Sequence, residues 1–103
     1  MSNNHADYEA LISQLAEALL MLEDEAELRA FLDDLLTKQE ILSFAKRLEA
    51  ARLLKNGATY QEVREKVEIS NTTITRINTF LQYGDGGYQN ILTRLEERTG
   101  KKK

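Results

Sequence analysis

Apolar residues recur along most of the chain at alternating spacings of three and four, which is the period of an amphipathic helix. No proline interrupts the pattern, and glycine is concentrated at residues 84–87, which favours helices joined by short connections. We therefore expect an all-α protein of five or six helices. The expected ranges are 6–22, 25–36, 38–55, 60–67, 71–83 and 88–98.

The segment 38–55 differs from the others because its apolar residues cover much more than one stripe of a helix. A helix that is apolar on several sides is packed on several sides. In a chain of 103 residues, which buries a modest fraction of its surface, we expect a second subunit to supply part of that packing.

Capping signals mark the starts of three of these helices. A side chain that can cap a helix is followed three residues later by a glutamate, the pattern of a capping box. The three capping pairs are Asp24 with Glu27, Thr37 with Glu40, and Thr59 with Glu62. At the other end of the segment 38–55, Asn56-Gly57 is a typical helix terminator.

The segment 59–81 has the pattern of a helix-turn-helix, continuing into the helix predicted to end at residue 83. This motif needs two short helices at a fixed angle, held by a few apolar contacts. Here the apolar residues fall on the inner faces of both helices and in the turn between them. They are Val63, Val67, Ile69, Ile74, Ile77 and Leu81.

The outer face of the second helix in this segment is small, polar and rich in hydroxyl groups. Such a face can enter the major groove of DNA and reach base edges, and threonine methyl groups can contact the thymine methyl. Threonine is also a poor helix former, so helix stability alone does not account for four of them within residues 72–80. The residues are Asn71, Thr72, Thr73, Thr75, Arg76 and Thr79.

The charge distribution changes the first impression given by a net charge of −3. Residues 1–45 hold ten acidic and two basic side chains, whereas residues 46–83 hold seven basic and four acidic ones. A local basic surface is enough to meet phosphates, although non-specific binding of DNA by an acidic chain should be weak.

Glu68 lies in the turn where many such motifs have glycine in a left-handed conformation. A side chain in that conformation costs about 1–2 kcal/mol. We therefore expect the turn to be of a different type, or slightly longer.

From spacing alone, two amphipathic core helices with a solvated threonine-rich face remain an alternative to DNA binding, since the same geometry occurs in proteins that never contact DNA. The matching function would be a helical protein–protein interaction module on the same scaffold, which the acidic first half of the chain favours. A small enzyme has no support, because no nucleophile–base pair can be assembled.

Four pieces of the sequence resemble the Trp repressor family, and within it the Trp-repressor-related YerC/YecD group. They are LLTKQEI (35–41), AKRLEAARLLKNG (45–57), TYQEV (59–63) and TTITRINTFLQYG (72–84). The resemblance covers about residues 28–92, and the Ile74-Thr75-Arg76 triplet is its more specific part. It implies a single DNA-binding domain over residues 1–103 that forms an intertwined homodimer, mainly through residues 6–55 and 86–98.

The resemblance also implies which residues contact DNA. Thr73 and Thr75 would face bases or phosphates, and Arg64 a phosphate. The full expected set is Gln61, Arg64, Asn71, Thr72, Thr73, Thr75 and Arg76, with further phosphate contacts from Lys46, Arg47 and Lys55.

L-tryptophan, the ligand of the Trp repressor itself, is not expected as a cofactor here. The family places the indole between two arginines, with counterparts in Arg47 and Arg76, and the Trp repressor has glycine directly after the second one. This chain has Ile77 there, which would occupy the volume needed by the ring. The arginines would then serve phosphates, or pair with acidic neighbours such as Glu49.

Other classes of function are not expected. The chain has no cysteine and one histidine, His5, so neither a metal site nor a disulfide is predicted. No apolar run reaches the roughly 18 residues of a membrane span, and the first residues lack the pattern of a signal peptide. We expect a cytoplasmic protein whose partners are double-stranded DNA and its own copy.

Overall fold

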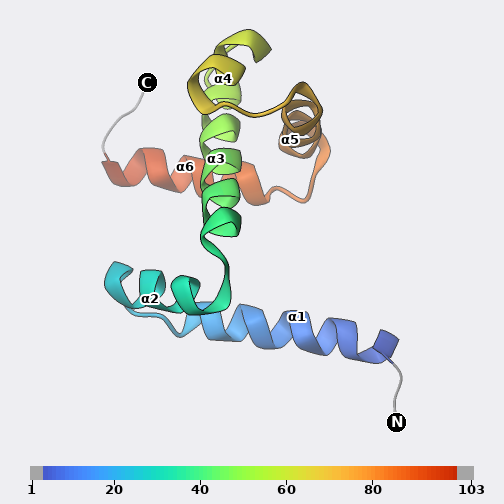
Figure 1. Ribbon diagram of the computed structural model, residues 1–103, viewed down its shortest axis with the longest axis vertical. Coiled ribbons are helices and arrows are strands. Elements are labelled where there is room, and N and C mark those ends of the chain that lie inside the picture. The colour runs from blue at the N-terminus through green and yellow to red at the C-terminus, as the bar shows by residue number, and fades with distance from the viewer. Residues whose placement is uncertain (1–3, 100–103) are drawn as a thin grey trace. The chain divides into compact units, whose positions relative to one another are not determined.

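The computed structural model describes residues 4–99, with side chains from residue 7 onward, and shows six helices and no strand within that range. The expected all-α class is confirmed. The helices are α1 (Asn4–Leu20), α2 (Glu25–Leu35), α3 (Lys38–Lys55), α4 (Tyr60–Val67), α5 (Asn71–Tyr83) and α6 (Gly87–Thr99) (Figure 1).

The apolar pattern of α1 continues beyond the helix itself, which ends at Leu20 instead of residue 22. The N–H groups of Met21 and Leu22 donate to Ala18 and Leu19, three residues back, at 3.1 and 3.3 Å. The last turn is thus tightened, as is common at helix ends.

The chain divides between residues 41 and 42, within α3, into two compact units. The first unit, residues 1–41, holds α1, α2 and the start of α3. Thr37 and Glu40 form the predicted capping box at α3. The Thr37 N–H donates to the Glu40 carboxylate at 2.9 Å, and the Glu40 N–H donates to the Thr37 hydroxyl at 3.0 Å. At α2, Asp24 accepts from the Glu27 N–H at 2.8 Å, while the Glu27 carboxylate accepts from Glu23 at 2.7 Å.

None of the described side chains of the first unit is buried. The apolar residues that follow the helical period on α1 are largely open, with Tyr8 62% and Ile12 46% exposed. We call this surface the α1 stripe. It consists of Tyr8, Leu11, Ile12, Leu15 and Leu19.

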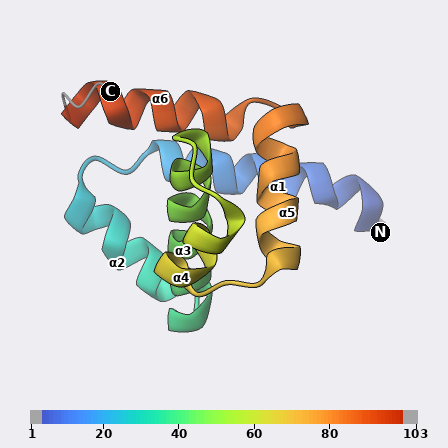
Figure 2. The same ribbon diagram turned by 90° about the horizontal axis from the view of Figure 1, so that it is seen from above.

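The second unit, residues 42–103, contains the hydrophobic core, to which four helices contribute. α5 packs against both α4 and α6, and the same neighbours are seen in the turned view (Figure 2). The core is small, so each of its side chains matters for the placement of α5. Its buried members are Ala50, Ala51, Val63, Val67, Ile74, Ile77, Leu81 and Leu92.

The part of α3 that lies in the second unit is buried on one side and open on another. Ala50 and Ala51 are fully buried, whereas Leu42 and Phe44 are each 51% exposed. The helix ends at Lys55, and the predicted terminator Asn56-Gly57 follows it, with a φ of 96° at Gly57 that suits glycine. The Gly57 and Ala58 N–H groups donate to Leu54 and Leu53, both at 3.0 Å, which is a Schellman motif.

Candidate nucleic-acid interface

α4 begins with the predicted capping box. The Glu62 N–H donates to the Thr59 hydroxyl at 3.1 Å, and the Thr59 N–H donates to the Glu62 carboxylate at 2.8 Å. Two backbone donors that the first turn cannot satisfy are thereby paired. The start of the motif's first helix is therefore fixed by these two residues.

The turn after α4 keeps the left-handed conformation although glycine is absent. Glu68 has φ 61° and ψ 56°, and its N–H donates to the carbonyl oxygen of Arg64 at 2.9 Å. The expectation that Glu68 would produce a different or longer turn is therefore wrong. The backbone hydrogen bond and the buried neighbours Val63 and Val67 stabilise the turn against the local strain.

Ser70 caps α5, a role that the sequence analysis did not assign. Its hydroxyl accepts from the Thr73 N–H at 3.2 Å and donates to the Thr73 hydroxyl at 3.1 Å. A serine directly before the first residue of a predicted helix is the signal that could have identified it.

The inner face of the motif is buried as predicted. Ile74 is fully buried, Ile77 is 3% exposed and Leu81 is 5% exposed, all on α5. They pack in one cluster with Val63 and Val67 of α4. Since a close-packed cluster leaves little freedom of rotation, α5 presents one defined outer face.

That outer face contains most of the predicted DNA-binding residues of α5. Asn71, Thr72, Thr75 and Arg76 are all exposed. Thr79 is exposed as well, but its hydroxyl donates to the carbonyl oxygen of Thr75 at 2.9 Å. The face therefore combines the hydroxyl groups of Thr72 and Thr75 with the Asn71 amide, whereas the exposed Arg76 side chain also lines a pocket described below.

Thr73 is the exception among the predicted α5 residues. It is half-buried and lines a pocket, and its hydroxyl is bonded to Ser70. On α4, the Gln61 amide donates to the Glu65 carboxylate at 3.1 Å. Arg64 is half-buried and donates to the Asn71 side chain at 2.6 Å, a link across the turn that the sequence did not indicate.

The basic residues predicted on α3 have different surroundings. Arg47 is exposed, with its guanidinium 5.8 Å from the ring centre of Phe44. Lys46 is half-buried and borders a shallow hollow shared with Lys66 of α4. Lys55 lies 3.6 Å from the Glu96 carboxylate of α6, which already supplies a negative partner.

Glu49 pairs with Arg52 rather than with Arg47. The Arg52 guanidinium donates to both carboxylate oxygens, at 2.8 and 2.7 Å. These hydrogen bonds lower the pKa of Glu49, with help from the charges of Arg52 and Lys66 and against the effect of partial burial. The same bonds raise the pKa of Arg52.

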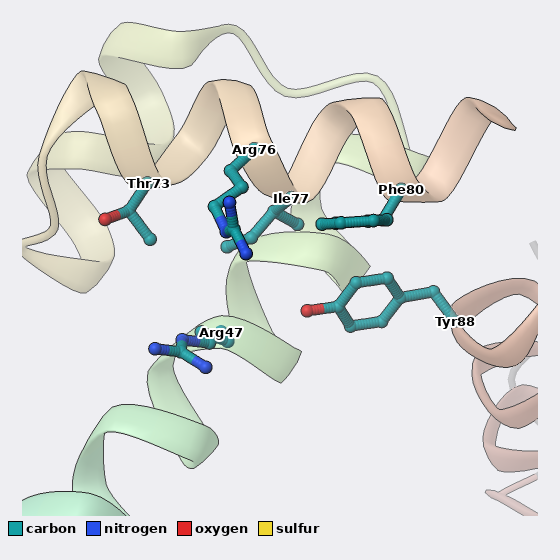
Figure 3. A pocket seen from close by; sticks show the side chains of 6 residues that line it. All are labelled: Arg47, Thr73, Arg76, Ile77, Phe80 and Tyr88. Carbon is teal, nitrogen blue, oxygen red and sulfur yellow. The ribbon is translucent and has the colours of Figure 1, made fainter. Parts of the chain in front are cut away.

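A pocket of about 260 Å³ lies under α5, between it, α3 and α6. Arg76 reaches from α5 toward α3, and the Tyr88 hydroxyl of α6 points toward Arg76 and Arg47 (Figure 3). Ile77 forms part of the wall, and Phe80 lies beside Tyr88.

Phe80 and Tyr88 were not predicted as pocket residues. The Arg76 guanidinium lies 5.4 Å from the centre of the Phe80 ring, within the range of a cation–π contact. An aromatic residue four positions after an arginine on one helix is the signal that could have found this contact. Tyr88 also packs against the core.

In the part of the chain that the structure describes, no helix is both long and apolar enough to cross a membrane. Among the same residues, no three histidine, aspartate or glutamate side chains gather as metal ligands. The side chain of His5 falls outside the described residues.

Comparisons with known proteins agree on one family. A family model described as Trp repressor protein matches residues 10–96. The chain is 41% identical over 86 residues to the uncharacterized protein YerC of Bacillus subtilis (strain 168), a match covering 84% of this chain and 83% of YerC.

Solved structures show the same likeness. A candidate Trp repressor from Staphylococcus aureus matches with a TM-score of 0.82 and 34% identity, over 93% of this chain and 96% of that one. A TrpR-like protein from Eubacterium eligens ATCC 27750 matches with a TM-score of 0.81 and 40% identity, over 90% and 95%. The chain therefore belongs to the Trp repressor family, within the Trp-repressor-related group that includes YerC.

Proposed function

We propose that this chain is a sequence-specific DNA-binding regulator that represses transcription, acting in the cytoplasm as a homodimer on double-stranded DNA. One observation carries the proposal. A capped α4–turn–α5 motif buries the apolar face of α5 and leaves Asn71, Thr72, Thr75 and Arg76 exposed together. Membership of the Trp repressor family supports it.

In this proposal α5 enters the major groove. Its exposed amide and hydroxyl groups reach base edges, since these groups are short enough to approach them. The basic residues of α3 and α4 contact phosphates on either side. The proposed DNA contacts are Gln61, Arg64, Asn71, Thr72, Thr73, Thr75 and Arg76, with phosphates also met by Lys46, Arg47 and Lys55.

The proposed homodimer would cover the apolar surface that one chain leaves open. The α1 stripe and the exposed Phe44 of α3 form far more apolar surface than isolated surface residues would. A twofold dimer would hold two α5 helices about 34 Å apart, which is one turn of DNA.

We propose that L-tryptophan is not a ligand of this protein and that regulation uses another effector or none. Ile77 is 3% exposed and belongs to the core cluster. A side chain held by that packing cannot leave the pocket without exposing apolar surface. Phe80 further reduces the space beside Arg76.

A selection experiment tests the function. The full-length protein is mixed with a library of random-sequence duplexes, bound duplexes are recovered by mobility shift, and the cycle is repeated. We expect a consensus with two related half-sites about one helical turn apart. Genomic fragments carrying it should shift at lower protein concentrations than scrambled duplexes. Failure to enrich any sequence would contradict the proposal and favour a protein–protein interaction module.

A further inference from the structure

The Arg64 side chain crosses the turn between α4 and α5. Its Nη1 donates to Oδ1 of Asn71, the first residue of α5, at 2.6 Å. The backbone carbonyl oxygen of Arg64 accepts a hydrogen bond from the Glu68 N–H at 2.9 Å, and this bond closes the left-handed turn. Arg64 thus contacts both the turn and the start of the helix after it.

We propose that Arg64 is a positioning residue for DNA reading, which holds the Asn71 amide so that Asn71 offers hydrogen-bond donors to the DNA. This inference rests on the proposed function. It replaces the phosphate contact that the family resemblance and the proposed function give to Arg64, and it adds a chemical preference to Asn71.

The chemistry of the two groups fixes the orientation of the amide. A guanidinium only donates hydrogen bonds, so the amide group facing it must be the carbonyl oxygen. The bond is charge-assisted, and such bonds are stronger than those between neutral groups. The NH₂ group of Asn71 is left for another partner on the exposed side of α5.

This orientation restricts what Asn71 can recognise. Reading adenine with two bonds needs the amide oxygen to accept from the base while the nitrogen donates to it. In this protein Arg64 occupies one of the two lone pairs of that oxygen and holds the oxygen toward α4, so the NH₂ group is the part of the amide that remains unoccupied. Asn71 is therefore suited to an acceptor atom, which can be guanine O6 or N7, thymine O4 or a phosphate oxygen.

The first test changes the donor but keeps the arginine contact. Asn71→Asp has nearly the same shape, still accepts from Arg64, and replaces the NH₂ group by a second oxygen. We expect an unchanged or higher melting temperature, because an ion pair forms near a helix N-terminus. Affinity for a duplex selected by the wild-type protein should fall at least ten-fold.

Gln82→Glu is the matched control, since it adds one negative charge on an exposed position of the same helix. It should lower affinity for the selected duplex less than three-fold. Equal losses in the two variants would overturn the inference, because charge alone would then explain the effect. Unchanged binding by Asn71→Asp would overturn it as well.

The second test measures coupling between the two residues. Arg64→Met, Asn71→Ala and the double variant are compared for the ratio of affinities for selected and scrambled duplexes, with circular dichroism as the check of folding. We expect each single variant to lower the ratio several-fold and the double variant to be no worse than Asn71→Ala. The slope of log affinity against log salt should stay nearly constant in Arg64→Met.

Additive losses, or a slope lower by about 0.9 with an unchanged ratio, would make Arg64 an independent phosphate contact and overturn the inference. Because Asn71→Asp keeps the arginine, the first test does not depend on the folding of Arg64→Met. If the wild-type protein itself selects no sequence, the proposed function fails, and this inference fails with it. If the wild type selects a duplex and only the variants disagree, the inference alone fails.

Discussion

Thr75 and Thr79 lie one turn apart on α5, and both are exposed, yet the proposed function gives a DNA contact to Thr75 alone. The Thr79 hydroxyl donates to its own helix at 2.9 Å, at the carbonyl of Thr75. Replacing each threonine by alanine therefore distinguishes the loss of a proposed DNA contact from the loss of a hydrogen bond within α5.

Thr75→Ala should lower discrimination between selected and scrambled duplexes by about 1 kcal/mol, because it would remove the proposed base contact. Thr79→Ala, the matched control, should leave discrimination unchanged. Mobility-shift titrations of both variants with both duplexes measure the difference. Equal effects of the two substitutions would show that the reading face of α5 is wrongly assigned.

Glu68 has a backbone conformation that costs a side-chain-bearing residue about 1–2 kcal/mol, whereas glycine adopts it freely. Glu68→Gly should therefore raise the free energy of unfolding by about 0.5–1 kcal/mol, after the greater entropy of glycine in the unfolded chain is subtracted. Urea unfolding at pH 7 measures it.

Glu68→Ala is the control, because it removes the same charge and keeps the Cβ atom. Its stability should stay below that of Glu68→Gly. If alanine stabilises the protein as much as glycine does, the gain comes from the lost charge and not from the backbone conformation.

At the scale of a helix, the Glu49–Arg52 pair on the surface of α3 gives a pH dependence. Arg52 lowers the pKa of Glu49 in the folded state, so the pair stabilises the fold above the ordinary glutamate pKa of about 4.3. That contribution is lost as the pH falls through the lowered value. Both side chains are 46% exposed, so solvent screening keeps the contribution small.

We expect Arg52→Met to be less stable than the wild type by about 0.5 kcal/mol at pH 7. The difference should shrink as the solution is acidified below pH ~4. Urea unfolding at several pH values checks this. The Glu49→Gln variant should show no such pH-dependent response to Arg52→Met, and a response that persists in it would assign the effect to another group.

The pocket under α5 is lined by residues of α3, α5 and α6, and Ile77 forms part of its wall. The position of Ile77 leads to a prediction about L-tryptophan. In the proposal that L-tryptophan is not a ligand, an indole ring between Arg47 and Arg76 would compete with Ile77 for space, and overpacking of this kind typically costs about 1–3 kcal/mol. Calorimetry with millimolar L-tryptophan should therefore give no saturable heat, and a thermal-shift scan should give no stabilisation. Binding at micromolar affinity would show that the pocket accepts the ring despite Ile77.

The helices α4 and α5 could be predicted well because two independent signals agree there, whereas the conformation of the turn between them was predicted wrongly. The apolar spacing gave the helices, and the Thr59–Glu62 capping box gave the start. The partners of individual side chains could not be predicted in the same way. Thr73 and Thr75 are two positions apart, about 200° around a helix, so they do not share a face. Grouping them on one polar face was therefore wrong: Thr73 lines the pocket and is bonded to Ser70, whereas Thr75 is exposed.

The α1 stripe shows a different limit of the sequence. Its period correctly predicted a helix, and its apolar face is largely open within one chain. Periodicity identifies the apolar face of a helix, but it does not show whether residues of the same chain or of another chain pack against that face. The bare stripe is therefore a property of the whole molecule, and the proposed homodimer is the structure in which it would be buried.

Light scattering at micromolar concentration should give the mass of a dimer. Leu15→Glu, which places a charge on the α1 stripe, should shift the mass toward that of one chain, because an unpaired charge is costly at an apolar interface. Gln14→Glu adds the same charge at the neighbouring exposed position and should remain dimeric. A monomer mass for the wild type would contradict the proposed assembly.

The lack of buried side chains in the described part of the first unit also has a consequence for hydrogen exchange. Amide protons exchange slowly where opening a helix disrupts buried packing, and quickly where it does not. In a chain alone, the amides of α1 should therefore exchange orders of magnitude faster than those around Ile74 and Leu92, which are fully or almost fully buried. Any partner that covers the stripe will slow the exchange in α1 first, so deuterium uptake by this one helix reports how much of the protein is assembled.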